Sequence, residues 1–237
     1  VYNERPFAVL MATPVDLTAF AVGFSITEGI VATAAECLAV EVHEVARGRE
    51  VRLTIPEGRA LALAARARAM AGRTGCGLCG VDQIAEALRP VERPASHASF
   101  TTDAIAAAVA AFPLGQPLNA ATGATHAAAF ADADGRVLLT REDVGRHNAL
   151  DKLIGAMAGA EIDGGTGFVV VSSRCSYEMV HKTAAAGIPA IVSVSAPTGL
   201  AVDLAARLGV GLAAFARDGR FTVYAGDRRF EDVAPAE

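Results

Sequence analysis

The chain has 237 residues, which is long enough to bury a substantial core without disulfide or metal staples. Its net charge of -5 at pH 7 argues against a general nucleic-acid binder and against a protein that binds anionic membranes. No apolar run approaches the length of a transmembrane helix and the first residues show no signal-peptide pattern, so the cytoplasm is the expected location. The chain starts at Val1 rather than Met, so the question of what precedes it stays open.

The first part of the chain predicts a small lobe. Apolar periodicity and β-branched runs predict a helix at 16–31, a strand pair at 39–45 and 50–55, and helices at 59–71 and 81–88. The segment that follows contains Pro90 and Pro94 and no periodic pattern, which favours a linker. We therefore expect an N-terminal lobe at 1–95 and a main lobe at 96–237.

The main lobe alternates between helical and strand patterns. It predicts a helix at 101–112, a hairpin of strands at 127–131 and 137–140, a helix at 147–158, a strand at 167–172, a helix at 176–186, a strand at 190–194, a helix at 198–208, and a closing strand pair at 212–216 and 221–224. Asp134-Gly135 supplies the hairpin turn, and Thr101 or Thr102 is available as a helix cap. The order predicts an α/β fold, a mixed sheet with flanking helices.

A glycine-rich segment within the N-terminal lobe carries two cysteines. Residues 72–80 read GRTGCGLCG, with four glycines in nine residues, so a mobile loop that carries Cys76 and Cys79 is expected. Arg66, Arg68 and Arg73 lie just upstream, and nearby positive charge lowers the pKa of a thiol.

Three uses of this cysteine pair compete: a redox dithiol, half of a zinc site, and a sulfur-carrying persulfide. A four-ligand zinc site needs a second pair, but Cys37 and Cys175 are single and no His stands at a zinc-site spacing, so no structural metal is expected. A thioredoxin-like dithiol opens a helix directly after a strand, whereas here a helix and a loop come first, so this use ranks second.

A dense charged connection follows the predicted hairpin, in the stretch REDVGRHN at 141–148. Arg146 and the start of the next helix can bind a phosphate through a guanidinium and free N–H groups. The plain alternative makes Asp143 a helix cap and gives Arg146 a surface ion pair, and the two interpretations stand equal on sequence alone.

Two hydroxyl-rich turns each follow an apolar strand and lead into a helix. The first contains Ser173 and Arg174, and the second contains Ser195 and Thr198. Such turns lie at the carboxyl ends of strands, where nucleotide-like ligands bind, so both are expected to face one crevice. Ser176 and Thr198 are equally expected to cap helices, and His126, at a glycine-containing turn, is expected either to face the same crevice or to make a structural hydrogen bond.

Several motifs together resemble one family, the accessory sulfurtransferases that mature formate dehydrogenases. The resemblance spans almost the whole chain and rests on Asn3-x-Arg5-Pro6, Ala12-Thr13-Pro14, Gly23-Phe24, Glu28-Gly29, the CGLCG loop, Thr122-Gly123-x-Thr125-His126, Glu142-Asp143-Val144-Gly145-Arg146-His147-Asn148-Ala149-x-Asp151-Lys152, Ser173-Arg174, Glu178-Met179-Val180 with Lys182, Ser195-Ala196-Pro197-Thr198, and Phe215-Ala216-Arg217-Asp218-Gly219-Arg220.

The resemblance implies a cytidine-deaminase-like layered α/β fold and a homodimer. It implies that a cysteine desulfurase donates persulfide sulfur, which this chain passes to the molybdenum bis(molybdopterin guanine dinucleotide) cofactor before that cofactor enters the formate dehydrogenase apo-enzyme. It makes Cys76 the persulfide carrier and Cys79 its helper. The residues expected to contact the cofactor are Phe215, Ala216, Arg217, Asp218, Gly219 and Arg220.

The site hypothesis joins this segment to the two hydroxyl turns. GDP is expected to bind there as an analogue of the cofactor's guanine dinucleotide end. A second hypothesis is a non-catalytic chaperone that only binds and delivers the cofactor, and a third is a dithiol oxidoreductase that reduces disulfides. The first requires Cys76, the second requires neither loop cysteine, and the third requires both.

Overall fold

The computed structural model describes residues 1–71 and 90–232. The GRTGCGLCG segment with Cys76 and Cys79, and the helix predicted at 81–88, lie outside the described residues. Predictions about them therefore stay predictions.

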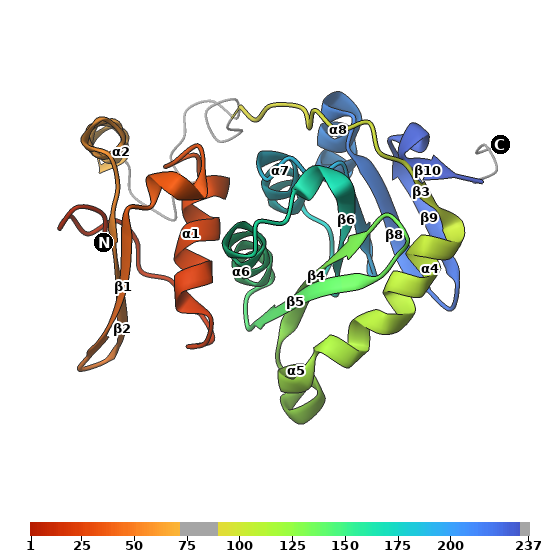
Figure 1. The fold of residues 1–237 in the computed structure, drawn as a ribbon, viewed down its shortest axis with the longest axis horizontal. Coiled ribbons are helices and arrows are strands. Elements are labelled where there is room, and N and C mark those ends of the chain that lie inside the picture. The colour runs from red at the N-terminus through yellow and green to blue at the C-terminus, as the bar shows by residue number, and fades with distance from the viewer. Residues whose placement is uncertain (72–89, 233–237) are drawn as a thin grey trace.

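A six-stranded sheet forms the centre of the main lobe, in the order β5-β4-β6-β7-β8-β9 (Figure 1). Its strands are β4 (His126–Asp132), β5 (Val137–Asp143), β6 (Gly167–Val171), β7 (Ala190–Ser193), β8 (Gly211–Arg217) and β9 (Arg220–Ala225). The three central strands β6, β7 and β8 are parallel, and a hairpin closes the sheet on each side. The carboxyl ends of the parallel strands therefore meet at one edge, which we call the carboxyl edge.

Both faces of the sheet are buried. Alternate residues of β6 enter different cores: Val169 and Val171 join one core, and Phe168 and Val170 join the other. The first face is covered by α6 (Arg146–Gly159), α7 (Tyr177–Ala185) and α8 (Gly199–Leu208), and the second by α4 (Thr102–Ala111) with the short pair β3 (Phe100–Thr101) and β10 (Phe230–Glu231). Burial on two sides explains why β6 and β7 are continuously apolar in sequence.

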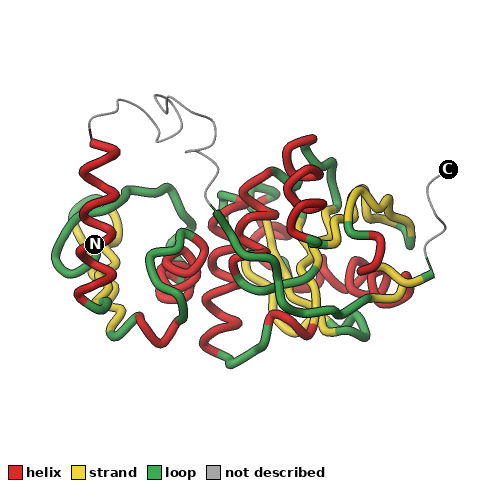
Figure 2. The backbone as a smooth tube through the Cα atoms, turned by 90° about the horizontal axis from the view of Figure 1, so that it is seen from above, coloured by secondary structure: helices red, strands yellow, loops and turns green. Residues whose placement is uncertain are grey.

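The N-terminal elements extend this stack outward. They are α1 (Leu17–Thr27), the hairpin of β1 (Ala39–Val45) and β2 (Gly48–Thr54), and α2 (Glu57–Ala71). In Figure 1, α1 lies against α6, the hairpin lies beyond α1, and the view from above in Figure 2 shows the same order. The contact is close because two glycines meet: a Cβ on Gly23 would lie 1.8 Å from the carbonyl oxygen of Asp151, and one on Gly155 1.8 Å from that of Ala19.

The predicted α/β class is confirmed, and each helix and strand predicted within the described residues is present in the predicted order, whereas the short strands β3 and β10 were not predicted. Boundaries differ by a few residues; the first helix ends at Thr27, because Gly29 turns the chain with φ 63°. Thr101 caps α4 by accepting a hydrogen bond from the Ala104 N–H. Helix α5 (Pro117–Thr122) was missed, since six residues are too few to show a helical period. The cytidine-deaminase-like layering and the division at residue 95 stay predictions.

No helix in the described ranges combines the length and the apolar character that a bilayer crossing requires.

Candidate functional site

The two hydroxyl turns lie side by side at the carboxyl edge. The Cys175 N–H donates to the Ala196 carbonyl at 3.1 Å, and the Thr198 N–H donates to the Cys175 carbonyl at 2.9 Å. Ser193 adds a third link, because its hydroxyl donates to the Ser173 carbonyl at 2.7 Å. Turns that are 20 residues apart in the chain are thus joined by backbone geometry, as parallel neighbouring strands require.

The β8–β9 hairpin adjoins the second turn. The Phe215 N–H donates to the Ser195 carbonyl at 3.3 Å. Phe215 has a φ of 54°, a left-handed conformation that costs free energy for a residue with a Cβ. A register shift at this point leaves the Phe215 side chain 41% exposed, with its ring centroid 6.4 Å from that of Tyr224, while Ala216 is buried. Of the segment expected to contact the cofactor, the residues with exposed side chains or backbone are Phe215, Arg217, Asp218, Gly219 and Arg220.

Some turn residues use their side chains in hydrogen bonds within the protein, whereas others are free to contact a ligand. Thr198 caps α8, because its hydroxyl accepts from the Ala201 N–H at 3.3 Å, and this confirms one of its predicted roles. Ser176 occupies the N-cap position of α7 but does not cap it with its side chain; its hydroxyl donates instead to Glu178 Oε2 at 2.7 Å. The prediction that Ser176 caps its helix is therefore wrong. Arg174 is exposed, so its guanidinium can meet a ligand.

The charged connection after β5 is not a solvated surface loop. Asp143 and Lys152 form an ion pair of 2.6 Å in which both side chains have no exposed area. Gly145, not Asp143, occupies the N-cap position of α6, so the alternative prediction that Asp143 caps this helix is wrong. The surface ion pair proposed for Arg146 is also wrong: within residues 1–71 and 90–232 the structure gives it no ion pair, and its Nε is buried without a hydrogen-bond partner.

Two histidines flank Arg146 at this end of the sheet. His147 Nε2 lies 3.4 Å from Ser176 Oγ and 3.9 Å from Glu178 Oε2, which brings the N-termini of α6 and α7 together. Burial, and then the Arg146 charge, lowers the pKa of His147 to about 4. The same two causes lower the pKa of His126, so both imidazoles are mainly neutral at pH 7 and Arg146 supplies the positive charge.

Sequence reasoning missed His147, Ser176 and Glu178 as neighbours of the site. The REDVGRHN motif contained a signal for His147 only. The pairing of His147 with Ser176 depends on how α6 packs against α7, and the two residues are 29 positions apart.

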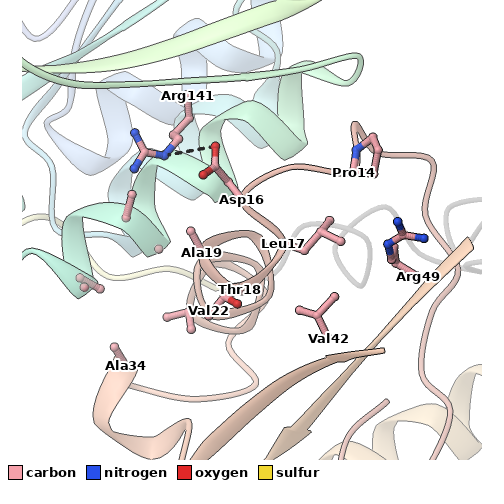
Figure 3. Close-up of a pocket in the computed structure, with 14 residues that line it drawn as sticks. Pro14, Asp16, Leu17, Thr18, Ala19, Val22, Ala34, Val42, Arg49 and Arg141 are labelled. Carbon is pink, nitrogen blue, oxygen red and sulfur yellow. Dashed lines mark ion pairs between the residues drawn. The ribbon is translucent and has the colours of Figure 1, made fainter. Parts of the chain in front are cut away.

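A shallow cavity of about 640 Å³ lies elsewhere, between α1, the β1–β2 hairpin and α6 (Figure 3). Its walls are mostly small apolar side chains, with Asp16, Arg49 and Arg141 as its charged members. Arg141 Nε lies 3.5 Å from Asp16 Oδ2. Of the predicted site residues that fall in the described ranges, none lines this cavity, so we locate the candidate site at the carboxyl edge.

The two cysteines within the described residues are poor nucleophiles. Cys175 is fully buried, and burial raises the pKa of its thiol to about 12. Cys37 is half-buried, and burial also raises the pKa of its thiol. Upstream of the glycine-rich segment, Arg66 is already engaged, since its Nη1 donates to the Glu28 carbonyl at 3.0 Å and its Nη2 lies 3.6 Å from the Glu28 carboxylate. Its charge is therefore partly neutralised rather than fully available to a thiolate.

Comparison with known proteins adds a family to this geometry. The model of the FdhD/NarQ family matches residues 1–231. The chain belongs to the FdhD/NarQ family. Its relatives in this family include proteins named Sulfur carrier protein FdhD from Xanthomonas euvesicatoria pv. vesicatoria, 50% identical over 98% of this chain and 82% of the relative, and from Cupriavidus necator, 50% identical over 99% and 81%.

A solved structure supports the same membership. A protein described as a formate dehydrogenase accessory protein from Desulfotalea psychrophila superimposes with a TM-score of 0.72 at 26% identity, covering 97% of this chain and 86% of that one. The resemblance drawn from motifs is therefore confirmed, and the fold of this FdhD/NarQ member is shared with a solved relative.

Proposed function

We propose that this chain is a sulfurtransferase that carries sulfur as a persulfide on Cys76 and passes it to the molybdenum bis(molybdopterin guanine dinucleotide) cofactor. The observation that carries the proposal is the match to the FdhD/NarQ family over residues 1–231, with relatives named as sulfur carriers at 50% identity. The sulfur serves formate dehydrogenase, with which the solved neighbour is associated by its description.

The loading step requires a thiolate on this chain. The Cys76 thiolate attacks the terminal sulfur of the donor's persulfide, a new S–S bond forms to Cys76, and the donor cysteine leaves as its own thiolate. Cys175 and Cys37 fit this role poorly, because burial raises the pKa of both thiols. Cys76 is therefore the proposed carrier, with Cys79 as its helper.

The carboxyl edge is the proposed binding site for the guanine dinucleotide end of the cofactor. Arg174 on the first turn and Arg217 and Arg220 on the β8–β9 hairpin are exposed, and guanidinium groups form paired hydrogen bonds with phosphate oxygens. The exposed face of Phe215 offers an aromatic surface to a base. The remaining proposed contacts come from Ser195, Thr198, Asp218, Gly219, His126 and Arg146. Ser173 and Ala216 are 4% and 1% exposed, so they are left out of the proposed contacts.

The proposed partners follow from this role. They are a cysteine desulfurase as donor, the formate dehydrogenase apo-enzyme as recipient of the loaded cofactor, and a second copy of the chain in a homodimer, all in the cytoplasm. No nucleic acid or membrane is part of the proposal, in keeping with the net charge of -5.

Persulfide mapping tests the proposal. The protein is incubated with a cysteine desulfurase and cysteine, and the sulfur adduct is located by mass spectrometry in the intact protein and in its peptides. An adduct on Cys76 that is lost in Cys76→Ala, together with failure of that variant to activate formate dehydrogenase, is the expected result. Full activation by a variant that lacks both Cys76 and Cys79 would favour the non-catalytic chaperone instead.

A further inference from the structure

Two adjacent carboxylates end the edge strand β5, and both are buried. Glu142 is 6% exposed and Asp143 is not exposed at all. Successive residues of a strand point to opposite sides, so the two carboxylates reach different neighbours. An ionised carboxylate away from water costs several kcal/mol unless its oxygens are hydrogen-bonded, so each one calls for a role.

Glu142 holds the segment that leads into His126. Its two oxygens accept from the N–H groups of Leu118 at 2.9 Å and Asn119 at 2.7 Å, in the first turn of α5. Its Oε1 also accepts from the Thr125 hydroxyl at 3.0 Å. Thr125 immediately precedes His126, so this carboxylate fixes the point at which β4 starts.

Asp143 holds the start of α6. Its Oδ1 accepts from the Gly145 N–H at 2.8 Å and from Asn148 Nδ2 at 3.0 Å. Its Oδ2 accepts from the Thr13 N–H at 2.9 Å and lies 2.6 Å from Lys152 Nζ. Arg146 and His147 directly follow Gly145, so these four contacts fix the backbone from which both side chains extend.

Neither carboxylate is exposed enough to contact a ligand directly, whereas the groups that they hold are partly exposed. We propose that Glu142 and Asp143 are positioning residues of the carboxyl edge: Glu142 places His126 through Thr125, and Asp143 places Arg146 and His147 through Gly145. The inference rests on the proposed function, because the edge is where that function seats the phosphate groups. A preset guanidinium binds a phosphate without a further cost of ordering.

Substitution of each carboxylate should affect a different histidine. Glu142→Gln and Asp143→Asn each replace one acceptor oxygen by an NH₂ group that faces existing donors, so the local backbone must move. Asp132→Asn is the matched control. Asp132 lies at the other end of the same hairpin and also accepts from two backbone N–H groups, those of Asp134 at 3.1 Å and Arg136 at 2.9 Å.

NMR titration measures the pKa values of His147 and His126, which should not change if the two carboxylates only stabilise the fold. In the wild type, burial and then the charges of Arg146 and Lys182 lower the pKa of His147 to about 4, against the opposing effect of the Glu178 and Glu28 carboxylates. Asp143→Asn should bring the pKa of His147 back toward 6.5, whereas Glu142→Gln should shift the titration of His126 and leave that of His147 in place. Asp132→Asn should change neither.

Calorimetry with GDP gives the second readout. Asp143→Asn should weaken GDP binding roughly fivefold to tenfold, the effect of one strained charge-assisted contact, and Asp132→Asn should leave it unchanged. Wild-type titrations in both Asp143→Asn and Glu142→Gln, with only the melting temperature reduced, would overturn the proposal.

Two milder variants serve if the first pair does not fold. Asn148→Ala removes one donor to Asp143, and Thr125→Val removes one donor to Glu142. They should shift the titrations of His147 and His126, respectively, and unchanged titrations in both would overturn the positioning role. A wild type that binds no GDP would refute the proposed nucleotide site, while the histidine titrations would still decide whether the carboxylates position these residues.

Discussion

Lys182 on α7 donates to both carboxylate oxygens of Asp151 on α6 at 2.9 Å, and both side chains are buried. Thr27 at the end of α1 joins the pair: its hydroxyl donates to Asp151 Oδ1 at 2.6 Å and accepts from Lys182 Nζ at 2.9 Å. Three helices from distant parts of the chain therefore meet at one ion pair. Burial raises the pKa of Asp151 while Lys182 lowers it, which describes a carboxylate that depends on its partner to stay charged.

Lys182→Met should destabilise the protein by about 3 to 5 kcal/mol, because it leaves the Asp151 carboxylate buried without its cation. Urea unfolding measures the loss. The double variant Asp151→Leu with Lys182→Met should recover much of it, since no unpaired charge then remains. Arg52→Met, which breaks the exposed ion pair with Glu50, is the control and should cost far less. Equal losses in the two single variants would contradict this account.

Gly155→Ala should destabilise the fold by about 1 to 3 kcal/mol, because the new Cβ would lie 1.8 Å from the Ala19 carbonyl oxygen and force α1 away from α6. Gly159→Ala changes the same helix where a Cβ meets no atom within 4 Å, so it should be neutral or stabilising by up to about 1 kcal/mol. Thermal unfolding compares the two variants. A similar melting temperature for both would show that the helices do not depend on this close approach.

Arg174→Ala should weaken GDP binding by roughly 1.5 to 3 kcal/mol with little effect on folding, since Arg174 is exposed and its proposed role is a charge-assisted contact with phosphate. Isothermal titration calorimetry measures the affinity. Arg136→Ala removes an exposed guanidinium at the opposite end of β4 and β5, and it should leave GDP binding unchanged. Unchanged affinity in Arg174→Ala and in Arg220→Ala would refute the proposed nucleotide site but not the sulfur-carrier role.

His147 should make stability depend on pH. Its pKa is 6.5 when unperturbed and about 4 in the folded protein, because burial and then Arg146 disfavour the charged form. Between pH 4 and pH 6.5 the His147 imidazole is protonated in the unfolded chain but neutral in the folded protein. Its contribution to stability is therefore full above pH 6.5 and is lost as the pH falls toward 4. His147→Gln should show a smaller decline over this window in urea unfolding at pH 7.5, 6 and 5. Parallel declines in the variant and the wild type would exclude His147 as the cause.

Cys76 should react with iodoacetamide at neutral pH before Cys37 or Cys175. Burial raises the pKa of both comparison thiols, to about 12 for Cys175, so little thiolate is available from either. Mass spectrometry of peptides over time gives the three rates. Labelling of Cys175 at the rate of Cys76 in the folded protein would remove the argument that burial separates the carrier from the other thiols.

Local patterns were sufficient to predict much of the fold and part of the site. The strands at Gly167 and Ala190 show as apolar runs, and the hydroxyl-rich turns after them follow from strand-to-helix connections, so the pairing of Ser173 with Ser193 could be anticipated at the level of topology. Thr101 and Thr198 could be predicted as helix N-caps because capping depends only on residues close together in the sequence.

The rest depends on contacts that no local pattern contains. Asp143 is buried because Thr13, 130 residues earlier in the chain, donates to it, and Lys152 also donates to the Thr13 carbonyl. A charged stretch such as REDVGRHN is solvated in most proteins, so the burial of Glu142 and Asp143 within it could be recognised only once the contacts of the N-terminal segment were known. The His147–Ser176 approach arises in the same way from the packing of two helices.

The contact between Gly23 and Gly155 also constrains how relatives of this chain can change over time. A larger residue at either position cannot be offset by a smaller one at the other, because glycine has no side chain left to remove. A larger residue at one position would have to move α1 as a whole, which would pull Thr27 away from Asp151 on α6 and Lys182 on α7. An alignment of relatives that keep this helix crossing should therefore show glycine at both positions, with departures only where the α1 side of the molecule has been rebuilt.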